Sequence, residues 1–256
     1  MTFTTSLLPP ASNSSQPPDR QCDVAVVIDV LRATSVMATA LSAGAREIMT
    51  CREVAIAFDL AADSNPIPLL CGERSCRRID GFDLGNSPAE YVEDRVRDRR
   101  LILTTTNGTR AIESVDSVPV VVTASFLNLS SIVRYLADFG RVHLVCAGTE
   151  GVVTLEDTLL AGAILWKYSW QHGAEPMDDA SNLAMQLWRS WFLEDVQRET
   201  MPSIDQLSER FRESRGGKNL LQLGFDDDLK RCAAIDSLDV VPARIKSDPA
   251  TFALQG

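Results

Sequence analysis

The feature that most constrains the fold is a regular alternation of short apolar runs with segments of helical periodicity. The first apolar run is Cys22–Asp29 (CDVAVVID), and residues 33–43 after it have small and apolar side chains on one helical face. Strands that alternate with helices form βαβ units, which build a mostly parallel sheet covered on both faces. We therefore predict an α/β fold with three layers (α/β/α) and a mostly parallel central sheet, with a mixed sheet as the alternative.

The same alternation gives the remaining elements of the prediction. The expected strands are 22–29, 47–51, 68–71, 100–104, 119–123, 142–147 and 239–243, and the expected helices are 33–43, 53–62, 88–96, 108–114, 130–139, 155–172 and 226–235. Residues 178–215 have a helical pattern that Pro202 interrupts, and we expect a break at Gly216–Gly217.

The N-terminal segment differs in composition from the rest of the chain. Residues 1–20 are rich in Ser, Pro and Thr, and their first basic residue is Arg20. A secretory signal would place positive charge before an apolar stretch. We therefore predict a flexible tail at residues 1–20 and a single α/β domain at residues 21–256.

Charge and cysteine usage narrow the choice of partners and compartment. Acidic residues outnumber basic residues by 35 to 25, for a net charge of −10, which argues against nucleic acid as a partner. No stretch approaches the roughly 18 apolar residues of a membrane span. Six cysteines without an export signal suit a reducing cytoplasm. A small anionic ligand remains the expected partner, and the sequence is compatible with a homo-oligomer.

Polar loops that carry glycine or hydroxyl residues follow several of the predicted strands. Ligands bind at the carboxyl ends of parallel strands, so we expect these loops to converge on one site. The loops are Asp29–Ser35, Gly72–Arg74, Phe82–Pro88, Thr104–Arg110 and Ala147–Gly151, with Glu156 and Asp157 close behind.

Four carboxylates in these loops are candidate ligands of Mg²⁺, which binds one or two carboxylates together with waters and substrate phosphate. Asp29 ends the first strand, although a helix N-cap or a pair with Arg32 would also explain it. Glu73 can ligate the metal or act as a base, or it lies in a solvated turn. Glu156 and Asp157 open a long helix, where acids also favour the helix dipole.

Hydroxyl, amide and arginine side chains in the same loops are candidates for binding an anion. Three threonines in succession, Thr104 to Thr106, exceed what one helix cap requires, although capping is the ordinary explanation. The candidate substrate-binding residues are Arg32, Thr34, Ser35, Asn86, Thr105, Thr106, Asn107, Gly108, Thr109, Arg110, Gly148 and Thr149. We predict Asp29, Glu73 and Arg74 as catalytic, with Arg74 clamping the anion.

Histidine chemistry has little support. His143 lies in a predicted strand and His172 at a helix end, where packing or capping explains each. With these two histidines alone, carboxylates and a metal ion are the remaining route to hydrolysis.

Seven stretches together resemble the 2-phosphosulfolactate phosphatase family. They are IDVLRATSVMATAL (28–41), GER (72–74), GFDLGNSPAEY (81–91), TTTNGTRAI (104–112), CAGTEGVVTLEDTLLAGAI (146–164), GGKNLLQLGFDDDL (216–229) and DVVP (239–242). Motif positions carried over from the resemblance are Asp29, Arg32, Glu73, Arg74, Asn107, Thr109 and Arg110. The resemblance implies a three-layer α/β/α fold and Mg²⁺-dependent hydrolysis of 2-phospho-3-sulfolactate, or a related phosphorylated 2-hydroxy acid, in coenzyme M biosynthesis.

Two other functions remain open from the sequence. Cys71 and Arg77 have the C-x5-R spacing of cysteine-dependent phosphatases, but Glu73 would place a negative charge inside the phosphate cradle. A non-catalytic, anion-binding regulatory protein would keep the threonine and arginine loops and lose the carboxylates. Asp29 and Glu73 are both present, which favours an enzyme.

Overall fold

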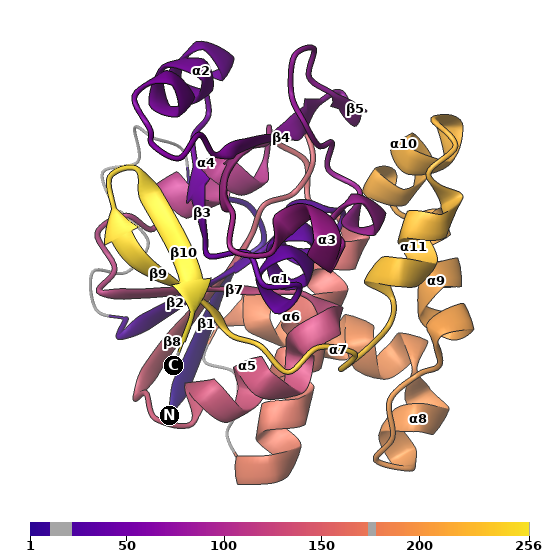
Figure 1. Cartoon of the computed structure of the whole chain (residues 1–256). Coiled ribbons are helices and arrows are strands. Elements are labelled where there is room, and N and C mark those ends of the chain that lie inside the picture. The colour runs from indigo at the N-terminus through magenta and orange to yellow at the C-terminus, as the bar shows by residue number, and fades with distance from the viewer. Residues whose placement is uncertain (11–21, 174–177, 256) are drawn as a thin grey trace.

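A ten-stranded mixed sheet runs through the computed structural model, which describes residues 1–10, 22–173 and 178–255 (Figure 1). The strands are β1 (Thr2–Ser6), β2 (Val24–Ile28), β3 (Glu47–Thr50), β4 (Leu69–Arg74), β5 (Arg77–Arg78), β6 (Arg100–Thr104), β7 (Val120–Ala124), β8 (Arg141–Cys146), β9 (Pro242–Ser247) and β10 (Ala250–Leu254). Their order is β1-β8-β2-β7-β9-β10-β3-β6-β4-β5.

Two groups of parallel strands make up most of this sheet. One group is β1-β8-β2-β7 and the other is β3-β6-β4. The antiparallel hairpin β9–β10 lies between them, because β9 pairs with β7 and β10 pairs with β3. The predicted α/β class with a mostly parallel, mixed sheet is therefore confirmed.

Helices pack against both faces of the first parallel group. The helical elements are α1 (Ala33–Ser42), α2 (Val54–Ala62), η1 (Pro88–Glu90), α3 (Glu93–Val96), α4 (Gly108–Glu113), η2 (Phe126–Asn128), α5 (Leu129–Leu136), α6 (Leu155–His172), α7 (Asp179–Trp191), α8 (Leu193–Gln197), α9 (Ile204–Glu213), α10 (Arg215–Gln222) and α11 (Asp226–Cys232). Successive side chains of a strand point to opposite faces. Val24, Val26 and Ile28 accordingly join a core with α5 and α6, whereas Ala25 and Val27 join another with α1 and α4.

The C-terminal helices bring distant sequence beside the end of β2. Leu207 of α9, Leu220 of α10 and Leu229 of α11 are buried in the same core as β2 and α6. Figure 1 shows α9, α10 and α11 together on one side of the molecule. Residues beyond 200 therefore reach the carboxyl edge of the sheet.

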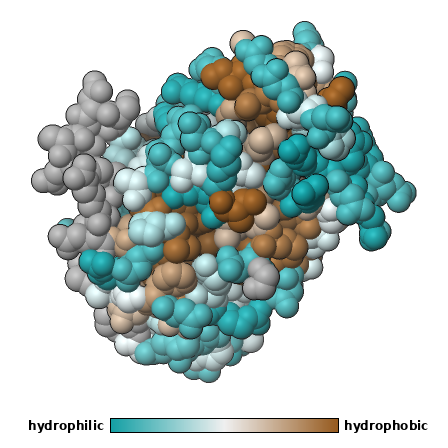
Figure 2. Space-filling view, turned by 60° about the vertical axis from the view of Figure 1, so that its left-hand side comes forward, coloured by the Kyte–Doolittle hydropathy of each residue, from teal (hydrophilic) through white to brown (hydrophobic). Residues whose placement is uncertain are grey.

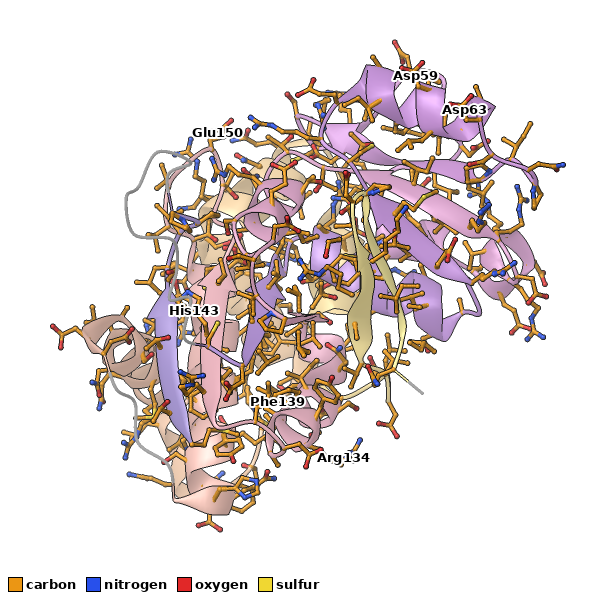
Figure 3. All side chains as sticks on the ribbon, turned by 90° about the vertical axis from the view of Figure 1, so that its left-hand side faces the viewer. Asp59, Asp63, Arg134, Phe139, His143 and Glu150 are labelled. Atoms are coloured by element: carbon orange, nitrogen blue, oxygen red, sulfur yellow. The ribbon has the colours of Figure 1, made fainter. Side chains whose placement is uncertain are left out.

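The N-terminal tail prediction is wrong for residues 2–6, which form β1 at one edge of the sheet. β1 is parallel to β8, and Phe3 is 1% exposed and packs edge-on against Tyr168, with ring centroids 5.0 Å apart. Thr4 Oγ1 lies 2.7 Å from Nδ1 of His143 on β8 (Figure 3). The Ser- and Thr-rich composition concealed a strand with alternating buried residues. The predicted tail residues 11–20 lie outside the described residues.

Two predictions near the C-terminus are also corrected. The predicted terminal strand at 239–243 begins only at Pro242, and β10 returns antiparallel to it. Gly216 and Gly217 lie inside α10 and do not break the chain. A Cβ at residue 217 would lie 1.8 Å from the Phe211 carbonyl oxygen, so glycine lets α10 pack closely on α9.

Some apolar side chains remain at the surface. Ile56 and Phe58 of α2 are 48% and 42% exposed. Figure 2 shows one group of apolar side chains at the top of the molecule, where α2 lies in Figure 1. In the described part of the chain, no helix combines the length and apolarity that crossing a membrane requires.

Candidate active site

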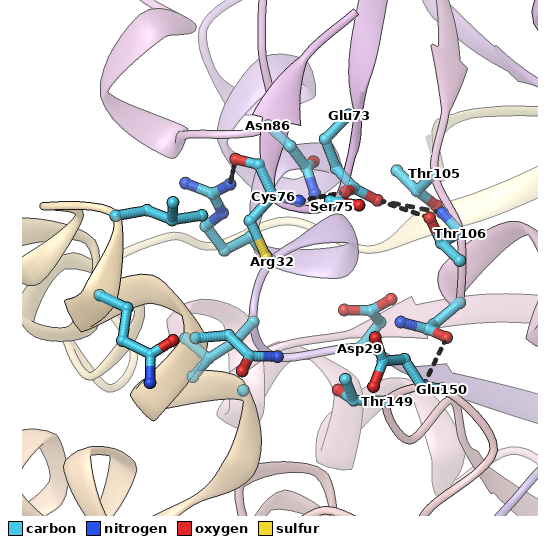
Figure 4. Close-up of a pocket in the computed structure, with 16 residues that line it drawn as sticks. Asp29, Arg32, Glu73, Ser75, Cys76, Asn86, Thr105, Thr106, Thr149 and Glu150 are labelled. Carbon is cyan, nitrogen blue, oxygen red and sulfur yellow. Dashed lines mark hydrogen bonds between the residues drawn. The ribbon is translucent and has the colours of Figure 1, made fainter.

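A cavity of about 300 Å³ opens where β2, β4, β6 and β8 end (Figure 4). Small-molecule sites are usually cavities of this kind, at the carboxyl edge of a parallel sheet. Its lining residues are Asp29, Leu31, Arg32, Glu73, Ser75, Cys76, Asn86, Thr105, Thr106, Asn107, Thr149, Glu150, Gly216, Asn219, Gln222 and Leu223. The convergence of the strand-end loops is thus observed.

Asp29 occupies the first position after β2 and is 7% exposed. Its Oδ1 accepts a hydrogen bond from the Ala33 N–H at 3.2 Å, and its backbone is fixed by Thr34, whose Oγ1 donates to the Asp29 carbonyl at 2.8 Å. A Cβ at residue 108 would lie 2.9 Å from Asp29 Oδ2 and 2.7 Å from Ala33 Cβ. The absence of a side chain at Gly108 therefore leaves room for the Asp29 carboxylate.

Glu73 faces the same cavity from β4 and is held by three donors. Its Oε1 accepts from the Thr106 N–H at 3.1 Å and from Thr106 Oγ1 at 3.2 Å, and its Oε2 accepts from the Cys76 N–H at 2.8 Å (Figure 4). These bonds fix the carboxylate. Thr106 occupies both lone-pair sites of Oε1, whereas Oε2 keeps one for a further ligand.

Two more carboxylates lie behind the cavity wall. Asp157 accepts hydrogen bonds from the Val30 and Gly148 N–H groups and from Thr154 Oγ1, so both its oxygens are engaged. Glu156 is 2% exposed, and its Oε2 has no partner among the described residues. Burial raises the pKa of each of these two carboxyls and that of Asp29, and their mutual repulsion raises all three pKa values further. The charge of Arg32 lowers the Asp29 pKa, but by less than burial and the neighbouring carboxylates raise it.

Arg32 lines the cavity, but its charge is already paired. Its Nη1 lies 2.6 Å from Asp228 Oδ2, with both side chains almost completely buried, and its Nη2 donates to the Cys76 carbonyl at 3.1 Å. The guanidinium also lies 4.4 Å from the ring centroid of Phe225, and Ser87 Oγ donates to Asp228 Oδ1 at 2.7 Å. Arg32 thus ties α11 and the loop before η1 to the end of β2.

Threonine and asparagine side chains form the rest of the strand-end wall. The Oγ1 atoms of Thr105 and Thr109 lie 3.3 Å apart, and the Thr109 N–H donates to Thr105 Oγ1 at 3.2 Å. Asn107 Oδ1 accepts from the Glu150 N–H at 3.2 Å, which leaves its NH₂ group as a donor. Thr105 therefore accepts from a backbone N–H in the first turn of α4 and also lines the cavity.

The structure brings only part of the predicted set together. Predicted residues that line the cavity are Asp29, Arg32, Glu73, Asn86, Thr105, Thr106, Asn107 and Thr149; those that do not are Thr34, Ser35, Arg74, Gly108, Thr109, Arg110, Gly148, Glu156 and Asp157. Arg74 donates to the carbonyls of Glu73 and Arg52. Arg110 donates to the Ala147 carbonyl at 3.3 Å. Neither arginine projects into the cavity.

Comparison with known proteins identifies the family of the chain. A family model described as 2-phosphosulpholactate phosphatase matches residues 11–246. The chain belongs to the 2-phosphosulfolactate phosphatase family. A probable 2-phosphosulfolactate phosphatase of Synechococcus sp. (strain JA-2-3B'a(2-13)) is 40% identical over 230 residues, covering 88% of this chain and 89% of the relative. One of Thermotoga maritima is 38% identical over 225 residues, covering 88% and 90%.

In this phosphatase family member, α10 supplies a wall that the sequence prediction missed. Gly216, Asn219, Gln222 and Leu223 line the cavity from the C-terminal helices. These residues lie in the stretch 216–229, which resembles the family. Neutral amides on a short helix do not by themselves indicate a binding site. Only the packing of α10 beside α9 and α11 brings them there.

The cysteine mechanism does not fit the position of Cys71. Its side chain is completely buried in the core beneath the sheet edge, and burial raises the pKa of its thiol far above the ordinary value. Arg77 is exposed on β5 and does not line the cavity. A thiolate nucleophile at Cys71 would reach neither the cavity nor a phosphate.

Cys71→Ser should therefore keep kcat/KM within about twofold of wild type, because the thiol takes no part in the chemistry. A hydroxyl in the apolar core should lower the unfolding free energy by about 1–3 kcal/mol. Steady-state kinetics alongside a melting curve checks both. Loss of kcat in a folded variant would restore the cysteine mechanism.

The donor set fits Mg²⁺ bound partly by the protein. Within the three described segments, no group of three or more His, Cys, Asp or Glu side chains is arranged to hold a metal ion. A protein-only cage is not needed, because Mg²⁺ binds through one or two carboxylates and keeps waters and substrate phosphate as its other ligands. Asp29 and Glu73 supply such a pair on one cavity.

Proposed function

We propose that the protein is a Mg²⁺-dependent phosphatase that hydrolyses 2-phospho-3-sulfolactate, or a closely related small phosphorylated 2-hydroxy acid, to the hydroxy acid and phosphate. The observation that carries this function is the pair of carboxylates, Asp29 and Glu73, facing one cavity at the carboxyl edge of the sheet in a member of this family. The proposed reaction would be a step of coenzyme M biosynthesis or of an equivalent pathway.

The charge of the cavity lining supports a requirement for a cation. In the described part of the chain, the lining carboxylates are Asp29, Glu73 and Glu150, of which Glu150 is paired with Arg215. The lining cation is Arg32, which Asp228 neutralises. A substrate with phosphate, sulfonate and carboxylate groups would be repelled by this lining. A divalent ion at Asp29 and Glu73 would reverse the local charge.

When bound, the ion would act as a Lewis acid on the phosphoryl oxygens and offset the charge that develops on them. The residues of the chain then have separate tasks. Asp29 and Glu73 would hold the ion, with Thr106 and the Cys76 N–H fixing the Glu73 carboxylate. The Thr105 and Thr149 hydroxyls and the Asn107 NH₂ would donate to phosphate oxygens.

Removal of divalent cations should lower phosphate release by at least about a hundredfold, because charge stabilisation by a metal is worth several kcal/mol. The measurement is phosphate release from a panel of small phosphoesters, including 2-phosphosulfolactate and 2-phospholactate, with excess chelator and after Mg²⁺ is restored. A full rate in chelator would contradict the metal requirement. Failure to release phosphate from every compound would favour the non-catalytic, anion-binding protein.

We also propose that the protein acts on a free small molecule in the cytoplasm. The net charge of −10 and the paired arginines favour a free small molecule over nucleic acid. Five of the six cysteines are buried, which suits a cytoplasmic enzyme. Exposed Ile56 and Phe58 on α2 are compatible with a homo-oligomer.

A further inference from the structure

The first turn of α10 lies between the residues that follow β2 and the start of α6. Gly216 belongs to this turn and lines the cavity. A Cβ at residue 216 would lie 2.1 Å from Glu156 Oε1 and 3.6 Å from Leu31 Cβ. The absence of a side chain at Gly216 therefore lets the Glu156 carboxylate contact the backbone of α10.

Glu156 is buried at this contact although it is a carboxylate. It lies in the first turn of α6, is 2% exposed, and its Oε2 has no partner among the described residues. Burying an unpaired carboxylate costs free energy, so an apolar side chain would serve better if Glu156 only filled the core. A carboxylate against the first turn of a helix is stabilised by the positive end of the helix dipole. The contact with α10 therefore offsets part of the cost of burying Glu156 and holds the helix at the same time.

A second carboxylate, from the loop between β8 and α6, holds the same turn from outside. Glu150 lines the cavity and forms an ion pair with Arg215, the first residue of α10. The side chains of Glu150 and Arg215 are 63% and 47% exposed, so this pair contributes little to stability by itself. The buried contact with Glu156 is the one that can fix the position of α10.

The position of α10 sets the distance between the two walls of the cavity. Asn219, Gln222 and Leu223 form the wall at α10, and Figure 4 shows the pale orange C-terminal helices opposite Asp29 and Thr106. The cavity has a volume of about 300 Å³. In a space of this size, a displacement of one wall by about 1 Å changes how a small substrate is held.

We propose that Glu156 is a positioning residue for the reaction: it holds the first turn of α10, and thereby the α10 wall, at the distance from the strand-end wall that the substrate requires. This inference rests on the proposed function. Glu156 acts through Gly216 and does not touch the substrate. Its task is separate from that of Asp29 and Glu73, to which the proposed function assigns the metal ion.

Exchanging the sizes of the two contacting residues tests this assignment. Gly216→Ala places a methyl group against Glu156 Oε1, so α10 must move away, and kcat/KM should fall by at least about tenfold, mainly through KM. Alanine favours a helix more than glycine does, so the loss cannot come from the helix propensity of α10. Glu156→Asp withdraws the carboxylate by one methylene group. The double variant should therefore have a kcat/KM at least about threefold above that of Gly216→Ala, whereas additive losses would overturn the inference.

Two further measurements distinguish a positioning role from metal binding and from a general loss of stability. Glu156→Gln should leave the Mg²⁺ concentration for half-maximal activity within about twofold of wild type, and a shift of about tenfold or more would overturn the inference in favour of a metal ligand. Amide hydrogen exchange of residues 215–222 should be at least about tenfold faster in Glu156→Ala, with the core strands protected as in wild type. Glu194→Asp, at an exposed position of α8, is the control and should change neither quantity.

The exchange measurement needs no substrate, so it separates this inference from the proposed function. Unchanged exchange across α10 in Glu156→Ala would overturn the inference and leave the phosphatase activity standing. If Glu156→Ala does not fold, the same exchange is measured on Glu156→Gln, with the same two outcomes. Failure of wild type to release phosphate from any of the phosphoesters would overturn the proposed function, and with it the catalytic purpose of the contact between Glu156 and Gly216.

Discussion

Asp29→Asn should abolish turnover, with a loss of kcat of at least about a thousandfold, while the protein stays folded. Asparagine keeps the shape of the side chain and an oxygen that can accept the Ala33 N–H. It removes the negative charge that a hard cation requires of its ligand. A role limited to capping the start of α1 would survive the substitution, and a role as metal ligand would not.

The melting temperature separates these two roles further. Burial and the neighbouring carboxylates raise the Asp29 pKa, so its ionised form is unfavourable in the metal-free protein. Without Mg²⁺, Asp29→Asn should therefore melt at or above the wild-type temperature. Added Mg²⁺ should raise the melting temperature of Asp29→Asn by less than it raises that of wild type. Asp59→Asn, on the outer side of α2 (Figure 3), is the matched control and should behave as wild type. Near-normal activity of Asp29→Asn with unchanged Mg²⁺ dependence would return Asp29 to a structural role.

Asp228→Ala should have the largest effect on stability, lowering the unfolding free energy by about 3–5 kcal/mol. The substitution leaves the Arg32 guanidinium buried beneath Phe225 without its counter-ion. It also removes the acceptor of the Ser87 hydroxyl. The melting temperature should fall by roughly 10 °C, given the usual scaling for a chain of this size.

A surface ion pair provides the control for this substitution. Lys230 and Asp205 lie 3.6 Å apart with side chains 56% and 84% exposed. Asp205→Ala should therefore lower the free energy of unfolding by no more than about 1 kcal/mol. Denaturant unfolding of both variants measures the difference. Equal, small losses would show that Arg32 finds another partner or water, and that the pair does not fasten the C-terminal helices.

The sequence predicted the parts of the fold and site that depend on local pattern. β2 is buried at every position, so its run of apolar residues marks a central parallel strand directly. Asp29 could be placed in the site because it follows that strand, and Thr105, Thr106 and Asn107 because they follow β6. Strand ends converge in a parallel sheet whatever the side chains are, which makes this inference robust.

Side-chain direction could not be predicted so well. The apolar run predicts a strand that ends at Cys71, but β4 continues to Arg74. Neighbouring residues of a strand point to opposite faces, so Glu73 faces the cavity and Arg74 turns away from it. Arg110 similarly reaches back to the Ala147 carbonyl. The sequence correctly places these charged residues at strand ends. The direction of each side chain depends on the exact residue at which the strand ends.

Contacts between distant segments account for the remaining differences. β1 is recognisable only from its pairing with β8, which follows it by more than a hundred residues. A two-residue turn joins β9 and β10, which makes them antiparallel, and each pairs with a different parallel group. The amides of α10 enter the site through packing on α9 and α11. None of these arrangements leaves a periodic signal in a single segment.

The position of the β9–β10 hairpin has a consequence for the order of folding. β7 and β3 are both synthesised long before residues 242–254, yet neither meets the other directly, since the hairpin lies between them in the sheet. On the ribosome, the two parallel halves can therefore form as separate units whose inner edges stay open until the hairpin emerges. Such open edges can pair with other chains. Deletion of residues 242–254 should thus favour aggregation during synthesis, even though no cavity-lining residue is removed.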